Sequence, residues 1–189
     1  TASVCCMPFV HVKLTSMGLR HGSAWATGQD QMRIVKARIR EMMPTASVFL
    51  DVDDLQRKKG KGAELVDASR VFLLFNTAGF WNSPNCLREV LRGVLRRKPF
   101  LMLMEPDPRR GRCTREQVRE LLRKLESDGK YADAKWGGGL SLEDEMNSWG
   151  GQVPTADKLE EMLFEFEPIA WDVSYLHSNH GYRVENAVT

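Results

Sequence analysis

The chain has 189 residues, of which 42% are hydrophobic and 28% are charged, and its formal net charge is +2. This length and composition fit one globular domain with a substantial core, and they exclude an intrinsically disordered chain. The small net charge gives no reason to expect a nucleic-acid partner. No apolar run approaches the roughly 20 residues that a membrane-spanning helix needs, so no membrane span is expected.

The four cysteines are Cys5, Cys6, Cys86 and Cys113. Their spacing matches neither a zinc site nor a disulfide framework, and the four histidines are scattered along the chain, so no metal site is predicted. Free thiols are typical of a reducing compartment, which favours a cytoplasmic location.

The first part of the chain predicts one strand, one loop and one helix. Alternating apolar and polar residues over residues 9–15 (FVHVKLT) predict the strand, and three glycines over residues 16–28 predict the loop. Helical spacing of apolar residues from Gln29, with Pro44 just beyond, predicts the helix. Its apolar positions are Ile34, Val35, Ile39, Met42 and Met43.

The central part of the chain alternates apolar strands with helices. Residues 47–55 (SVFLDVDDL), 70–76 (RVFLLFN) and 99–104 (PFLMLM) are apolar enough to be buried strands. Residues 63–69 and 86–98 provide the helices between them. Such strands, buried on both faces and joined by helices, indicate a parallel sheet, whose ligands bind beyond the carboxyl ends of the strands.

The helix expected over residues 86–98 is amphipathic. Its apolar residues recur with the spacing of one helix face, which should pack on the sheet. These residues are Leu87, Val90, Leu91, Val94 and Leu95. The other faces carry Arg88, Arg92, Arg96 and Arg97.

Two further helices are predicted after this sheet region. Thr114 and Gln117 form a capping box for a helix whose apolar stripe runs from Val118 to Leu125. Beyond Gly129 the pattern weakens until a helix expected over residues 156–166. We therefore divide the chain into an N-terminal segment with the first strand (1–28), an α/β domain (29–173) and a loose tail (174–189).

The order of elements over residues 47–98 resembles the middle of a TIR (Toll/interleukin-1 receptor) domain. A strand that ends in acids precedes a glycine-containing loop and a short helix, and a second strand leads to the family's motif S-x-x-C-x-x-E, here Ser83, Cys86 and Glu89. The resemblance extends more weakly from about residue 29 to about residue 171. It implies a flavodoxin-like three-layer α/β fold with about five mainly parallel strands in the order 2-1-3-4-5, the last at residues 168–173.

The resemblance implies a signalling module that acts through homotypic association, with itself or with other TIR domains as partners. The alternative is an assembly-activated NAD glycohydrolase in which Glu89 is the catalytic carboxylate and NAD is the substrate, with no cofactor. We expect Glu89 in the first turn of its helix, where the helix dipole favours a carboxylate. One carboxylate suffices to stabilise an oxocarbenium-like ribose, because nicotinamide leaves as a neutral molecule from a cationic ring. A purely helix-stabilising role for Glu89 is the simpler reading.

The residues that would surround NAD follow from the same motif. They are Phe80, Trp81, Ser83, Asn85 and Cys86. Many family members carry Trp where this chain has Asn85, so Phe80 or Trp81 would have to supply the aromatic surface for nicotinamide. Ordinary packing beneath the loop is the alternative for both aromatic residues, and Cys86 is expected to be a small buried side chain.

The basic loop corresponds to a segment that gates the nucleotide pocket and makes domain–domain contacts in TIR domains. Its spacing is not that of a Walker A loop. The interaction residues implied there are Lys58, Lys59, Gly60, Lys61 and Gly62. A surface that combines this loop with the arginines of residues 86–98 would favour assembly, whereas simple solvation of the lysines is the alternative.

Acidic residues lie at the carboxyl ends of two of the predicted strands. They are Asp51, Asp53, Asp54, Glu105 and Asp107. Such a cluster is similar to the magnesium-binding acidic pocket of receiver domains. That class also requires a lysine after a later strand, and none follows residues 99–104, so the receiver interpretation is disfavoured.

Overall fold

The computed structural model describes residues 11–15, 28–50, 62–133 and 139–171. Its strands pair in parallel in the order β2-β1-β3-β4-β5, so the predicted α/β class with a parallel sheet is confirmed. The strands are β1 (His11–Thr15), β2 (Ser47–Leu50), β3 (Val71–Asn76), β4 (Phe100–Met104) and the two-residue β5 (Ile169–Ala170).

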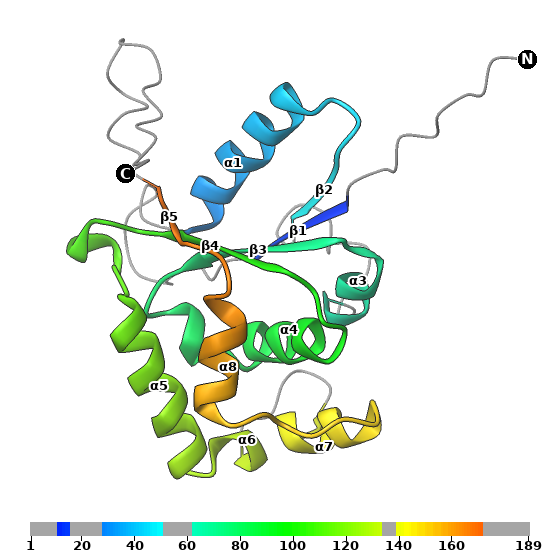
Figure 1. The fold of residues 1–189 in the computed structure, drawn as a ribbon, viewed down its shortest axis with the longest axis vertical. Helices are drawn as coiled ribbons and strands as arrows, with labels where there is room; N and C mark the ends of the chain where they lie inside the picture. Colours follow the sequence, from blue (N-terminus) through cyan, green and yellow to red (C-terminus); the bar gives the residue numbers. More distant parts are fainter. Residues whose placement is uncertain (1–10, 16–27, 51–61, 134–138, 172–189) are drawn as a thin grey trace, which may run out of the picture.

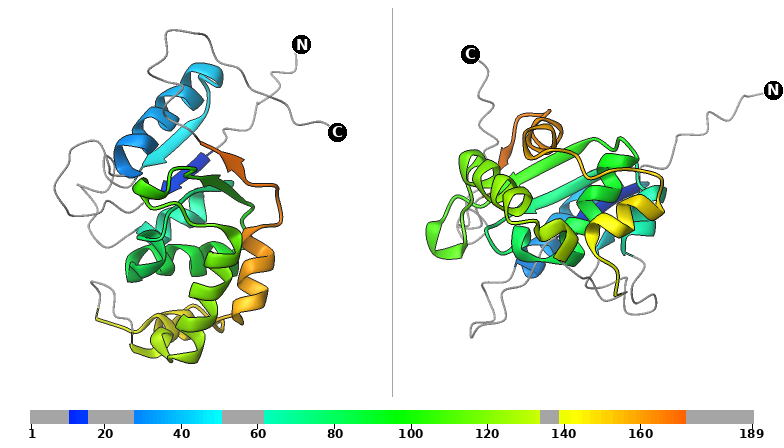
Figure 2. Two further views of the ribbon diagram at one scale, coloured as in Figure 1. Left: turned by 90° about the vertical axis from the view of Figure 1, so that its left-hand side faces the viewer. Right: turned by 90° about the horizontal axis from the view of Figure 1, so that it is seen from below.

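Helices cover both faces of the sheet (Figures 1 and 2). Helix α1 lies on one face, and α4, α5 and α8 lie on the other, with α7 outside α4. The helices are α1 (Gly28–Met42), α3 (Gly62–Ala68), α4 (Pro84–Leu95), α5 (Arg115–Ser127), α6 (Lys130–Asp133), α7 (Leu142–Ser148) and α8 (Ala156–Leu163). None of the helices in the described ranges is both long enough and apolar enough to cross a membrane.

Alternate residues of β3 divide the core into two clusters. Phe72 and Leu74 pack with α3, α4, α5, α7 and α8, whereas Leu73 and Phe75 pack with α1 and β2. This alternation follows from the pleat of a strand, which sends successive side chains to opposite faces. The continuous apolar pattern of the central strands is therefore explained by burial on both faces.

Helix α1 matches its predicted range, but its apolar stripe is only partly buried. Met32 and Val35 are buried against the sheet, whereas 73% of Met42 is exposed. Figure 1 shows why, because the carboxyl end of α1 projects away from the sheet. Ile34, Met42 and Met43 share the helical spacing of this stripe but are exposed.

The second half of the chain contains a helix that the sequence pattern missed. Ser141 caps α7 by accepting a hydrogen bond from the backbone N–H of Asp144 at 3.0 Å. Three acids follow in the first turn, where the helix dipole favours them. The predicted capping box of Thr114 and Gln117 on α5 is confirmed, with both of its reciprocal hydrogen bonds present.

Helix α4 ends in a left-handed residue that is not glycine. The N–H of Lys98 donates to the carbonyl of Gly93 and the N–H of Arg97 donates to that of Val94, each at 2.9 Å. This pair of bonds defines a Schellman motif, in which the residue after the C-cap adopts positive φ and is usually glycine. Here that residue is Arg97, with φ of 50°, the one non-glycine residue with positive φ in the described ranges.

Arg97→Gly is expected to raise the free energy of unfolding by about 0.5–1 kcal/mol. A left-handed conformation strains an L-residue, and the relief outweighs the greater backbone entropy that glycine loses on folding. Urea unfolding measures the change. Arg96→Gly is the matched control, because Arg96 has an ordinary φ of −87° and the substitution should destabilise the protein. Equal destabilisation by both substitutions would contradict the assignment of strain to Arg97.

Candidate functional site

The predicted site residues gather where β3 leads into α4. Phe80 and Trp81 lie in the short 3-10 helix η2 (Phe80–Asn82), and Ser83 caps α4 by accepting a hydrogen bond from the Cys86 N–H at 3.4 Å. Asn85 is exposed in the first turn. The loop residues Lys58, Lys59, Gly60 and Lys61 and the acids Asp51, Asp53 and Asp54 lie outside the described residues, and Gly62 begins α3.

The two aromatic residues expected to face nicotinamide lie in the core. Phe80 and Trp81 are 0% and 1% exposed, and their rings pack edge to face with centroids 5.1 Å apart. Such geometry is a favoured arrangement for aromatic pairs. In this structure the two rings pack beneath the loop, which is the alternative role that the sequence left open, and neither presents a ring face to solvent.

Asn76 is the polar centre of this corner, and its place at a strand end was the one sequence signal that pointed to it. Its Oδ1 accepts from Trp81 Nε1 at 2.8 Å, and its Nδ2 donates to the Cys113 carbonyl at 2.7 Å. The same Nδ2 lies 3.1 Å from the sulfur of Met104. Because Asn76 is fully buried, these bonds connect β3, η2, β4 and the segment before α5 without access to water.

Asn76→Ala is expected to lower the free energy of unfolding by about 3 kcal/mol. The substitution leaves the Trp81 N–H and the Cys113 carbonyl buried without partners and opens a cavity. Asn82→Ala is a matched control, because Asn82 donates only one exposed bond, to the carbonyl of Ala78. Its cost should stay below about 1 kcal/mol. Similar losses in urea unfolding for the two variants would refute a special role for Asn76.

Glu89 lies one turn further into its helix than predicted. Helix α4 begins at Pro84, so Glu89 is its sixth residue, and its first turn holds no acid. The first-turn expectation was wrong because Ser83 and Pro84 start the helix earlier: Ser83 supplies the cap, and Pro84 needs no N–H partner at the first position. Glu89 is 5% exposed, so the dipole of the first turn does not explain its place there.

The face of α4 opposite the sheet is also buried, by ion pairs. Arg88 donates to Glu145 of α7 from Nη2 at 2.6 Å and from Nε at 2.9 Å, and both side chains are 5% exposed. The guanidinium carbons of Arg88 and Arg92 lie 5.2 and 4.6 Å from the ring centroid of Trp149, a cation–π geometry. Arg88 and Arg92 therefore contribute little to a basic surface on this helix.

A second acid, Asp67, joins α3 to Arg92 and to Arg96. It accepts from Arg92 at 2.8 and 2.5 Å and from Arg96 at 3.1 and 3.3 Å. Burial acts to raise the pKa of Asp67, but the hydrogen bonds from Arg92 and Arg96 outweigh it and lower this pKa below its ordinary value. Lys98 completes the junction by donating to the backbone carbonyls of Asp67 and Ser69.

Glu145→Ala is expected to lower the free energy of unfolding by about 3–5 kcal/mol, because it removes the carboxylate that is hydrogen-bonded to the buried guanidinium of Arg88. Replacing both partners, with Arg88→Met and Glu145→Leu, should recover most of that loss, since neither charge of the pair then remains. A double-mutant cycle in urea measures the coupling. If the double variant were as unstable as the sum of the single variants, the pair would not act as a unit.

The acids after β4 take part in local turn contacts. Glu105 is 2% exposed and accepts a hydrogen bond from the Asp107 N–H at 3.0 Å. Asp107 pairs with the exposed Arg109. Across the ranges that the structure describes, no three His, Cys, Asp or Glu residues form a group able to hold a metal ion.

Two surface hollows lie among the described residues. One of about 320 Å³ adjoins the end of β3, between Ala78, Arg112, Cys113 and the exposed face of α5. Burial raises the pKa of the Cys113 thiol to about 11, so this group stays protonated and unreactive at neutral pH. Another of about 670 Å³ lies between α4 and α8, and Glu89 lines neither hollow.

Comparison with protein-family models and with curated proteins found no match to this chain. The TIR assignment therefore depends on the residues of this chain alone. It remains an interpretation of the ordered motifs over residues 47–98.

Proposed function

We propose that this chain is a TIR-type signalling module with a flavodoxin-like fold, which acts through association with further copies of itself or with other domains of that family. The observation that carries the proposal is the strand order β2-β1-β3-β4-β5 together with Ser83, Cys86 and Glu89 at the start of α4. The strand order is the one that the resemblance to TIR domains implies, and Ser83, Cys86 and Glu89 form the most specific motif of that resemblance.

The corner around Glu89 favours association over hydrolysis of NAD. A catalytic carboxylate must come within hydrogen-bond reach of the ribose, and Glu89 is 5% exposed. Phe80 and Trp81, the aromatic residues nearest to it in sequence, are packed in the core. Binding of nicotinamide at this place would require these side chains to rearrange.

The strand at one edge of the sheet offers a surface for association. Among the described strands, β5 pairs with β4 alone, and an apolar residue is exposed both just before β5 and within it. Phe166 is 44% exposed and Ile169 is 49% exposed. Exposed apolar side chains beside an unpaired strand edge are typical of contacts between protein chains.

Ile169→Lys is expected to weaken self-association by about tenfold, because it places a charge where a partner would have to desolvate it. Sedimentation over a range of protein concentrations measures the effect. Leu140→Lys is the matched control, since Leu140 is 44% exposed but lies outside the sheet. A parent protein that stays monomeric at high concentration, or equal weakening by both substitutions, would count against the proposal.

NAD consumption by clustered protein distinguishes the module from the hydrolase. We expect no nicotinamide release from the parent protein held at high local concentration on a surface. Nicotinamide release by the parent and none by a folded Glu89→Gln variant would contradict the pure interaction module and support an assembly-activated hydrolase.

A further inference from the structure

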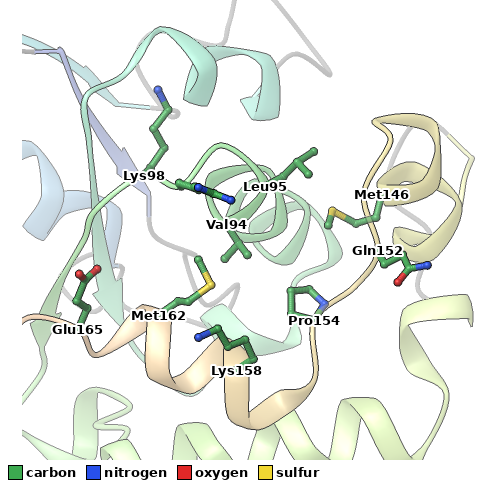
Figure 3. Close-up of a pocket in the computed structure, with 10 residues that line it drawn as sticks. Val94, Leu95, Lys98, Met146, Gln152, Pro154, Lys158, Met162 and Glu165 are labelled. Atoms are coloured by element: carbon green, nitrogen blue, oxygen red, sulfur yellow. The ribbon is translucent and has the colours of Figure 1, made fainter.

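A groove of about 670 Å³ lies between the carboxyl end of α4, the segment after α7 and helix α8 (Figure 3). Figure 3 shows Val94 of α4 and Met162 of α8 facing each other across it, with Met146 and Pro154 at the α7 side. Its volume falls within the range of about 300–1,000 Å³ that is typical of small-molecule sites.

The floor of the groove is apolar and consists of side chains packed in or against the core. Val94 and Met146 are 6% and 1% exposed and belong to the core, and Leu95, Pro154 and Met162 are half-buried above them. A Cβ on Gly151 would come within 2.6 Å of Leu95 Cδ1, so the chain passes close to α4 at this wall. Such a floor would accept the apolar body of a ligand.

The rim of the groove is cationic. Arg97, Lys98 and Lys158 line the groove together with the carboxylate of Glu165, and with Glu161 beside Lys158 the three cations still outnumber the two acids. Lys98 donates to neutral backbone carbonyls, and Lys158 pairs with Glu161 at 2.7 Å. The guanidinium of Arg97 has no hydrogen bond or ion pair within the part of the chain that the structure describes.

Arg97 is also the residue held at positive φ by the end of α4. Glycine would occupy that position without strain, so the fold is less stable with an arginine there than it could be. Local strain that brings a charged group to the edge of a cavity is a feature of ligand-binding sites. Arg97 therefore combines backbone strain with a guanidinium that has no partner among the described residues.

We propose that this groove binds a small amphipathic anion, an apolar body with one carboxylate or sulfonate group, and that Arg97 contacts the anionic group. The apolar floor receives the body of the ligand, and Lys98 and Lys158 add to the positive potential at the rim. The site is separate from the corner around Glu89 and from the edge strand β5, so it does not depend on the signalling role.

The test uses 8-anilinonaphthalene-1-sulfonate as the probe and N-phenyl-1-naphthylamine as its uncharged counterpart, both followed by fluorescence titration of the folded protein. We expect saturable binding of the sulfonate, roughly tenfold tighter than that of the neutral compound. Decanoate should displace the sulfonate, and decanol should not.

Three variants locate the site. Arg97→Gly should weaken binding of the sulfonate by roughly tenfold while making the fold more stable, so a loss of affinity cannot result from unfolding. Lys158→Gln should weaken binding by a smaller factor. Arg40→Gln, which removes an exposed arginine from α1 on the opposite face of the sheet, should have no effect.

Two results would overturn the proposal. One is parental affinity for the sulfonate in Arg97→Gly, which would show that the probe binds elsewhere. The other is equal binding of the charged and neutral probes, or binding of neither, which would show that the groove does not select anions.

Discussion

The structure depends on how helix α4, which has an apolar stripe and two arginines, is buried on both sides. The stripe of α4 packs on the sheet so closely that a Cβ on Gly93 would lie 2.7 Å from Phe100 Cζ. On the opposite side, Arg88 and Arg92 are buried as well, and a buried charge must be paired. Glu145 and Asp67 provide the partners, which fixes where α7 and α3 can dock.

Helix α4 contributes residues to both candidate sites, the corner around Glu89 and the groove beside α8. Its first turns carry the motif residues and Glu89, and its carboxyl end presents Arg97 to the groove beside α8. The two ends of α4 differ in how far their polar side chains are available to a ligand. At the amino end Ser83 caps the helix and Glu89 is buried, whereas the guanidinium of Arg97 at the carboxyl end is exposed and unpaired among the described residues.

Local sequence patterns predicted the central strands and most helices but not the burial and pairing of the charged residues. Apolar runs over residues 47–50, 71–76 and 100–104 were sufficient to identify the central strands, because burial on both faces leaves a continuous pattern. Helical spacing separated the stripe of α4 from its arginines, yet it could not show that Arg88 is buried, since its partner is distant in the sequence. The Ser141 cap and the acids after it were a usable signal for α7, hidden between two glycine-rich segments. The positive φ of Arg97 has no sequence signature, because it arises from the bonds that end α4.

The pairing of Arg88 with Glu145 also has a consequence for the order of events during synthesis. The acid follows the arginine by 57 residues, so β1 to β4 and all of α4 leave the ribosome before it. If the nascent sheet packs on α4 first, Arg88 stays exposed to water until α7 has been synthesised and docks. Docking of α7 is therefore a late step, and weakening it should speed unfolding far more than it slows folding.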